Sequence, residues 1–256
     1  MFSYLNLASG SKGNSSLVFD ESNLIVIDIG VTKSLLIEGL ESIGKSIDDI
    51  DIILITHNHI DHIKTLKYID ISKVRFVASA IKDKNFKKIN KLNYYQSFDI
   101  GKFNITPLRL SHDAPSIAGY LIKHENEELV YITDTGYIPL ETINLIKNKN
   151  YYIFESNHDI NMLLESNRSI NLKTRILSIE GHLSNDLASK YLIDLIGDKT
   201  KKILLAHLSE ECNTAELALK TFSDLLEKDG TYSLNINVRC LSQYKWTLLW
   251  LKLSLS

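Results

Sequence analysis

Asp51-Ile-Ile-Leu-Ile-Thr-His57-Asn-His59-Ile-Asp61-His62 is the stretch around which the rest of the chain is organised. Its apolar run is typical of a short strand buried on both faces, and four potential metal ligands follow within six positions. Side chains two apart on an extended segment share a face, so His57 and His59 point the same way, while Asp61 and His62 fall where the chain turns toward a helix. With only eight histidines in 256 residues, three in this stretch indicate a site for two adjacent metals.

The composition is that of an ordinary globular protein that can bury a sizeable core, with 44% hydrophobic and 23% charged residues. The net charge of -2 does not indicate a nucleic-acid or membrane partner, so such a partner requires a local patch. No apolar run is long enough to cross a bilayer and no signal-peptide pattern opens the chain, so we expect a cytoplasmic protein without a membrane partner. Cys212 and Cys240 form no paired motif and are expected to be reduced.

Strands and helices alternate along the chain, and no linker, repeat or low-complexity segment divides it, so we expect a single domain over residues 1–256. Helical spacing follows the ligand cluster over residues 63–71, and residues 168–175 are expected to form a basic loop. His124 lies among acidic turn residues and is expected to be solvated.

Four further polar residues follow apolar runs that are typical of buried strands. Asp28, His112, Asp134 and His207 each stand at or just past the end of such a run. A buried carboxylate at Asp28 is suited to hydrogen-bond a ligand histidine or the adjoining backbone. The strand ends therefore gather residue types that bind metals.

Small polar residues fill the turn at residues 9–15. Two interpretations stay open: a loose hairpin, or a backbone whose N–H groups and Asn14 approach a phosphate or the metal site. Ser184 is a natural N-cap for a helix over 186–196, and His182, next to a glycine, is placed to project from a loop into a site. His158 is expected either to support another site residue or to cap a helix.

Two cationic stretches stand out, the lysine-rich helix expected over residues 81–89, with Lys91 just beyond it, and the segment 168–175. Either is suited to grip a phosphate backbone, although a solvated lysine face is favoured for the first. The apolar segment 244–253 is expected to be core, with an interface between copies of the chain as the alternative, so a homo-oligomer stays open.

The chain resembles the metallo-beta-lactamase fold superfamily, because its His-x-His-x-Asp-His motif matches residues 57–62 and the other strand-end residues follow in the family's order. The resemblance covers essentially the whole chain. It implies an α/β (α+β) fold, a four-layer αββα sandwich of two mixed sheets with helices outside. The ligand set that it implies is His57, His59 and His112 for one metal, Asp61, His62 and His207 for the second, and Asp134 between them.

Two cations at such a site stand roughly 3.5–4 Å apart, turn a shared water into hydroxide at neutral pH, and stabilise the attacked and leaving oxygens. The resemblance thus implies two divalent metals and a metal-bridging hydroxide as nucleophile. Imidazole-rich ligation favours zinc, and the carboxylates also accept manganese. Asp61 has two roles open to it, as a metal ligand and as the group that orients the nucleophile.

Motifs including residues 9–14, 133–137, 155–159, 181–185 and 205–213 are similar to the YycJ/WalJ (VicX) subgroup, whose members resemble RNase Z. This implies phosphodiester hydrolysis on nucleic acid, with a 5′-to-3′ DNA exonuclease favoured over an RNA enzyme. His182 is expected to protonate the leaving oxygen, as in the RNase Z type. Ile60 departs from the small polar residue of the subgroup and is expected to alter packing only. The remaining expected roles are substrate contact for Asn14, Arg175, Ser184 and Asn185, and support of the site for Asp28 and His158.

Three alternatives stay open. The strongest is a small-molecule hydrolase for a phosphodiester, thioester or lactone on the same metals, because a groove that follows DNA should be more basic than this chain. A non-catalytic binding protein ranks below it, since no ligand position is lost. A di-iron oxidoreductase is disfavoured because that branch has Glu at the position of His59. A positive rim continuous with the metal site favours the nuclease, and a narrow enclosed pocket favours the small ester.

Overall fold

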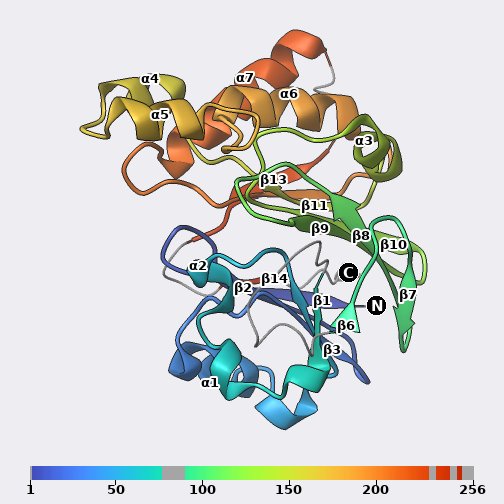
Figure 1. Cartoon of the computed structure of the whole chain (residues 1–256). Coiled ribbons are helices and arrows are strands. Elements are labelled where there is room, and N and C mark those ends of the chain that lie inside the picture. Colours follow the sequence, from blue (N-terminus) through green and yellow to red (C-terminus); the bar gives the residue numbers. More distant parts are fainter. Residues whose placement is uncertain (1, 77–89, 231–234, 243–246, 250–256) are drawn as a thin grey trace.

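The structure is a computed structural model that describes residues 2–76, 90–230, 235–242 and 247–249. The lysine-rich helix expected over 81–89 and most of the apolar segment 244–253 lie outside the described residues. Two sheets face each other, and helices cover their outer faces (Figure 1).

The first sheet has seven strands. β1 to β3 pair antiparallel, and from β3 to β6 the pairing is parallel. In spatial order the strands are β14 (Thr247–Leu249), β1 (Ser3–Ala8), β2 (Ser15–Phe19), β3 (Leu24–Ile27), β4 (Ile52–Ile55), β5 (Val74–Phe76) and β6 (Asn90–Lys91).

The second sheet repeats this arrangement, with antiparallel pairing from β7 to β10 and parallel pairing from β10 to β13. Its strands are, in spatial order, β13 (Asn237–Cys240), β12 (Lys202–Ala206), β11 (Tyr151–Glu155), β10 (Glu127–Ile132), β9 (Ala118–His124), β8 (Phe103–Arg109) and β7 (Phe98–Ile100). Both sheets are mixed, and both change to parallel pairing after an antiparallel meander.

Helices lie on the outer side of each sheet, with α1 outside the first and α3, α6 and α7 outside the second (Figure 1). The helices are α1 (Lys33–Glu41), α2 (Ile60–Ile63), α3 (Leu140–Ile146), α4 (Ile160–Glu165), α5 (Ile170–Ile176), α6 (Asn185–Leu195) and α7 (Ala215–Asp229). In Figure 1, α4 and α5 extend beyond the second sheet at one end.

Three apolar layers hold the sandwich together. The middle layer lies between the sheets and includes Tyr4, Tyr120 and Tyr131, which are almost entirely buried. The outer layers join each sheet to its helices, through residues such as Leu36 on one side and Phe222 on the other. Burial of apolar area at about 25 cal/mol per Å² makes these layers the main source of stability. The expected four-layer αββα fold is confirmed.

Two expectations about secondary structure are wrong. The helix expected over 63–71 is replaced by the four-residue α2 and a 3-10 turn at Leu66–Tyr68. The His62 carbonyl and the Thr65 amide bond to the backbone of Ile29, in the loop after β3, instead of continuing a helix. The basic loop expected over 168–175 is largely the helix α5, whose N-cap Ser169 accepts a hydrogen bond from the Leu172 amide.

His124 was expected in solvent and is buried. Its Nε2 lies 2.9 Å from Asp20 Oδ2, and its ring packs against Phe2 and Phe103. The β2–β3 turn at Asp20 covers His124, the last residue of β9, while Glu125 and Asn126 of the turn that follows are exposed as expected.

Candidate metal centre

Side chains from loops that follow strands of both sheets come together and form the candidate centre. The described part of the chain contains four overlapping groups of side chains whose ligand atoms lie within 4.8 Å of one another. The groups are His57, His59 and His112; Asp61, His62 and His207; His57, His62 and Asp134; and Asp134, Glu155, His182 and His207.

The first two groups are the two ligand sets expected from the sequence. One oxygen of Asp134 is 3.2 Å from His62 Nε2, and the other is 3.2 Å from His207 Nε2. Asp134 also forms a group with His57 and His62, so it adjoins both ligand sets. All seven residues predicted as ligands are therefore brought together by the fold.

Three residues at strand ends reach the centre through an unusual backbone conformation. Asp28, Asp134 and His207 follow β3, β10 and β12 and have φ of 58°, 58° and 56°. Such left-handed conformations cost non-glycine residues on the order of 1–3 kcal/mol and persist where the surroundings impose them. The Asp28 amide donates to Leu54 O, and the His207 amide donates to Ser9 Oγ, which holds both turns in place.

Glycine at position 30 allows the loop after β3 to lie directly on the backbone of α2. A Cβ at Gly30 would stand 1.5 Å from the Asp61 carbonyl oxygen, so no other residue fits without moving α2. The Asn14 amide donates to that carbonyl, and the Ile29 amide donates to His62 O. This close approach sets the position of Asp61 and His62.

Asp28 fixes the orientation of His62. Its Oδ2 lies 2.8 Å from His62 Nδ1, and its two oxygens accept hydrogen bonds from the Thr56 amide and hydroxyl. With Nδ1 engaged, Nε2 of His62 faces Asp134 and Asp61. Burial alone lowers the pKa of His62, but Asp28 and Asp134 outweigh it and hold that pKa well above its ordinary value.

Glu155, at the end of β11, fixes the orientation of two other histidines of the centre, as Asp28 does for His62. Its Oε1 lies 2.8 Å from His182 Nδ1 and 3.2 Å from His207 Nδ1, and its Oε2 accepts from the amides of Thr135 and Leu183. Burial raises the pKa of Glu155, but the two imidazoles outweigh it and lower the value to about 2. Sequence reasoning missed this residue, although a buried strand ending in a carboxylate was a usable signal.

The unsatisfied atoms of the centre fit a divalent metal. His57 Nε2 and His207 Nε2 are buried and have no hydrogen-bond partner among the described residues. Leaving a buried polar atom unpaired costs about 1–3 kcal/mol, which coordination to a cation would offset. Burial, together with the charge of His62, lowers the pKa of His57 well below its ordinary value and keeps it in the neutral form that binds metals. The residues present therefore suit the two metals that the sequence implies.

Asp113 is a second residue that sequence reasoning did not assign. Its Oδ1 lies 3.1 Å from His112 Nε2 and 3.9 Å from His59 Nε2, and its Oδ2 is 2.6 Å from Arg175 Nε. His112 is oriented by its Nδ1, which lies 3.0 Å from the Gly181 carbonyl oxygen. Asp113 thus connects His112, in the group of three histidines, to the guanidinium of Arg175.

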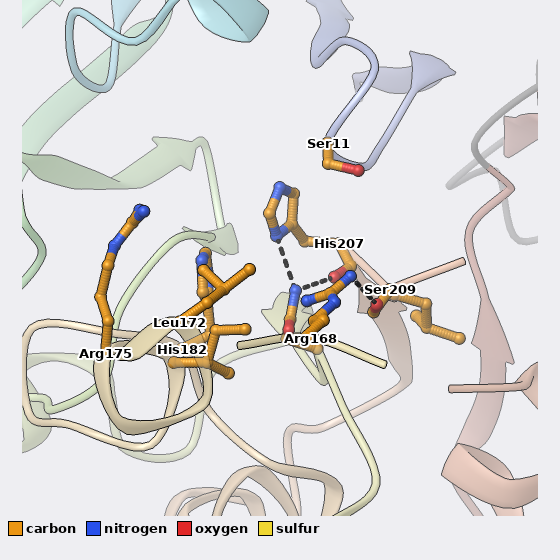
Figure 2. Close-up of a pocket in the computed structure, with 10 residues that line it drawn as sticks. Ser11, Arg168, Leu172, Arg175, His182, His207 and Ser209 are labelled. Carbon is orange, nitrogen blue, oxygen red and sulfur yellow. Dashed lines mark hydrogen bonds between the residues drawn. The ribbon is translucent and has the colours of Figure 1, made fainter. Parts of the chain in front are cut away.

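A pocket of about 120 Å³ adjoins the centre and shares two of its residues, His182 and His207 (Figure 2). Its other lining residues are Ser11, Asn157, Arg168, Leu172, Arg175, Ile176, Leu208 and Ser209. Of the four residues predicted to contact substrate, only Arg175 lines this pocket.

The side chains of the other three residues predicted to contact substrate are hydrogen-bonded to other groups of the protein. Asn14 is fully buried, and its Nδ2 lies 2.9 Å from His62 Nε2 and 3.4 Å from Asp61 Oδ2. Of the two interpretations of its turn, the structure therefore favours the one in which the turn approaches the metal site. Ser184 caps α6, as expected, and Asn185 is buried in hydrogen bonds with other side chains. Both belong to the start of α6 and do not line the pocket.

His158 is not a helix cap, because Asp159 caps α4 by accepting from the Met162 amide. Its ring is buried, and neither ring nitrogen has a hydrogen-bond partner within the described ranges. Burial lowers the pKa of His158 to about 4. Its backbone carbonyl accepts from the Asn185 amide, so its visible contribution is to anchor the start of α6.

A family model described as the beta-lactamase superfamily domain matches residues 25–207. The chain belongs to the metallo-beta-lactamase superfamily. It is 35% identical to "Exodeoxyribonuclease WalJ" of Streptococcus pneumoniae serotype 2 strain D39 over 239 residues, and the matched region covers 88% of each chain. It is also 35% identical over 234 residues to "Exodeoxyribonuclease YycJ" of Bacillus anthracis, covering 88% of this chain and 89% of that protein.

The superfamily fold is also seen in solved structures. The crystal structure of Zn²⁺-bound PqqB from Methylobacterium extorquens superposes with a TM-score of 0.68 at 12% identity, covering 97% of this chain and 100% of that one. In the described part of the chain, no helix has the length and apolar character needed to span a bilayer.

Proposed function

We propose that this chain is a dinuclear-metal phosphodiesterase that degrades DNA, an exodeoxyribonuclease working from the 5′ end, and that residues 1–256 form one domain. The observation that carries the proposal is the convergence of all seven expected ligand residues at the strand ends. The relatives named exodeoxyribonucleases, which match over nearly nine-tenths of the chain, support DNA as the substrate.

In this proposal, His57, His59 and His112 would hold one cation, and Asp61, His62 and His207 would hold the second, with zinc preferred and manganese accepted. Asp134, which adjoins both sets, would be available to either cation. When bound, two such cations activate water at neutral pH and stabilise negative charge on the phosphate oxygens. Asp61 is assigned as a ligand and retains a second role in orienting the nucleophile.

His182 is the residue we assign to the leaving group. Hydrolysis breaks a P–O bond, and the oxygen that leaves needs a proton. The Glu155 carboxylate can only accept when ionised, so it holds a proton of His182 on Nδ1 and fixes the orientation of the ring. His182 also lines the pocket, with 15% of its side chain exposed, so its free nitrogen has access to a bound substrate.

The test is a digestion with metal-analysed, purified protein. End-labelled single- and double-stranded DNA and RNA are incubated beside a chromogenic phosphodiester. We expect two metals per chain and progressive loss of DNA from its 5′ end. Protein that holds two metals and leaves DNA intact contradicts the proposal.

A second candidate is a hydrolase for a small phosphodiester, thioester or lactone. The small volume of the pocket and the net charge of -2 favour it. Hydrolysis of the chromogenic ester without cleavage of any nucleic acid would select this alternative.

A further inference from the structure

Two arginines enter the pocket beside the candidate centre. Arg168 lies in the loop between α4 and α5, and Arg175 lies in the last turn of α5. In Figure 2 both appear with His182 and His207, while Ser11 comes from the loop between β1 and β2. We propose that this pocket binds the 5′-terminal phosphate of the DNA strand that is being cut. The inference rests on the function proposed above and names the end group that the enzyme recognises.

The charges around the pocket favour a phosphate monoester. No carboxylate belongs to its lining within the residues that the structure describes. Arg168 uses Nε for Glu211 and one Nη for Ser209, while Arg175 contacts Asp113 through Nε. A guanidinium has five N–H donors in a rigid fork, so both side chains keep donors for the oxygens of an anion.

The existing ion pairs do not prevent phosphate binding. Each pair has one side chain that is about half exposed, Glu211 and Arg175, and one that is about a quarter exposed, Arg168 and Asp113. Water reaches at least one charge of each pair and weakens the attraction between the partners. A terminal phosphate carries close to two negative charges and accepts bidentate hydrogen bonds, so it competes well for the same arginines.

The pocket has room for a tetrahedral oxyanion beside the candidate centre, with a volume of about 120 Å³. Because His182 and His207 belong to both sites, a phosphate held here would lie next to the candidate metal ligands. A terminal phosphate carries close to two negative charges, more than an internal phosphodiester, so two arginines at this position favour the end of a strand.

The experiment compares two DNA duplexes that differ only in a 5′-phosphate or 5′-hydroxyl at the labelled strand. With the metal-loaded full chain we expect kcat/KM to be roughly 10- to 100-fold higher for the phosphorylated end, the value of one or two charge-assisted hydrogen bonds. Arg168→Ala and Arg175→Ala should each bring this ratio toward one. Arg168→Lys should give an intermediate ratio, because it keeps the charge and loses the fork.

The matched control is Lys190→Ala, which removes an exposed cation of α6 in a separate surface hollow and should leave the ratio as in the parent chain. Circular dichroism and metal content identify any variant that fails to fold. Equal rates on the two duplexes with the parent chain overturn the inference.

A second arm separates this inference from the proposed function. Inorganic phosphate is titrated calorimetrically into the metal-loaded chain and into Arg168→Ala and Arg175→Ala. If no DNA is cut, the proposed function fails, and weaker phosphate binding by the variants still supports the pocket. If DNA is cut and phosphate binds all three proteins equally, the pocket assignment fails and the function stands.

Discussion

Asp28, directly after β3 of the first sheet, and Glu155, the last residue of β11 in the second, are buried carboxylates that make the same kinds of contact. They differ in the number of histidines that each one contacts. Each stands at or just past the end of a strand and holds Nδ1 of a histidine in the centre. Asp28 accepts one backbone N–H, and Glu155 accepts two. Asp28 holds one histidine, and burial raises its pKa more than His62 and Thr56 lower it. Glu155 holds two, and its pKa falls to about 2. The balance between burial and cationic partners, not burial alone, decides the charge of such a residue.

The two sheets extend the comparison. Each changes from antiparallel to parallel pairing, at β3 and at β10, and each has a left-handed aspartate close behind that strand, Asp28 and Asp134. Asp28 supports a histidine from behind, whereas Asp134 lies between two histidines at the centre. Equivalent positions in the two halves therefore serve different tasks.

The largest expected effect comes from removing the metals, since both halves contribute ligands. Prolonged dialysis against a chelator should abolish DNA cleavage, and added zinc should restore it. The loss of bound metal should lower stability by about 4 kcal/mol for each metal that is present at 1,000 times its Kd, measurable as a lower Tm. DNA cleavage by the metal-free protein at the parent rate would refute a metal-dependent mechanism.

His182→Ala should lower kcat by about 10²–10⁴-fold, the usual contribution of a general acid. Metal content should stay at the parent level, because His182 is not assigned as a ligand. Steady-state kinetics and elemental analysis check both statements. Loss of metal would make His182 a ligand, and unchanged turnover would remove it from the mechanism.

Glu155→Gln tests the carboxylate that contacts two histidines. We expect about 10- to 100-fold weaker metal binding through His207, the usual effect of removing a partner of a ligand histidine. Turnover should remain below the parent value in excess zinc, because His182 also loses its anionic partner. Glu165→Gln, on the exposed surface of α4, is the control. Full rescue by zinc would show that Glu155 acts on the metal alone.

Asp28→Asn tests the other carboxylate and should have the smallest effect. Metal binding through His62 should weaken about 10- to 100-fold, while the group His57, His59 and His112 keeps its metal. Elemental analysis should then approach one metal per chain, and excess zinc should restore activity. If both metals are lost, the two halves of the centre are more strongly coupled than the contacts indicate.

Much of the centre was predictable because its ligands follow directly on apolar runs. The motif at residues 57–62 and the positions of His112, Asp134 and His207 are local features, and the structure brings them together as expected. Glu155 and Asp113 were missed because their roles depend on contacts with residues far away in the sequence. Glu155 contacts His182 and His207, which lie 27 and 52 residues further along the chain. Asn14, Ser184 and Asn185, expected at the substrate, are used instead to fix ligands or to start α6.

By itself, the sequence determined the alternation of strands and helices and the metal-binding residue types at the strand ends, because these patterns are properties of neighbouring residues. The two-sheet fold class and the set of seven candidate ligands followed from the resemblance of its motifs to the superfamily. Only the tertiary structure decided which nitrogen of each histidine is held, which carboxylates are charged, and that two arginines of the α4–α5 region share a pocket with His182 and His207. Those properties arise from distances between segments far apart in the chain, and the strength of each charge depends on burial that no local pattern encodes.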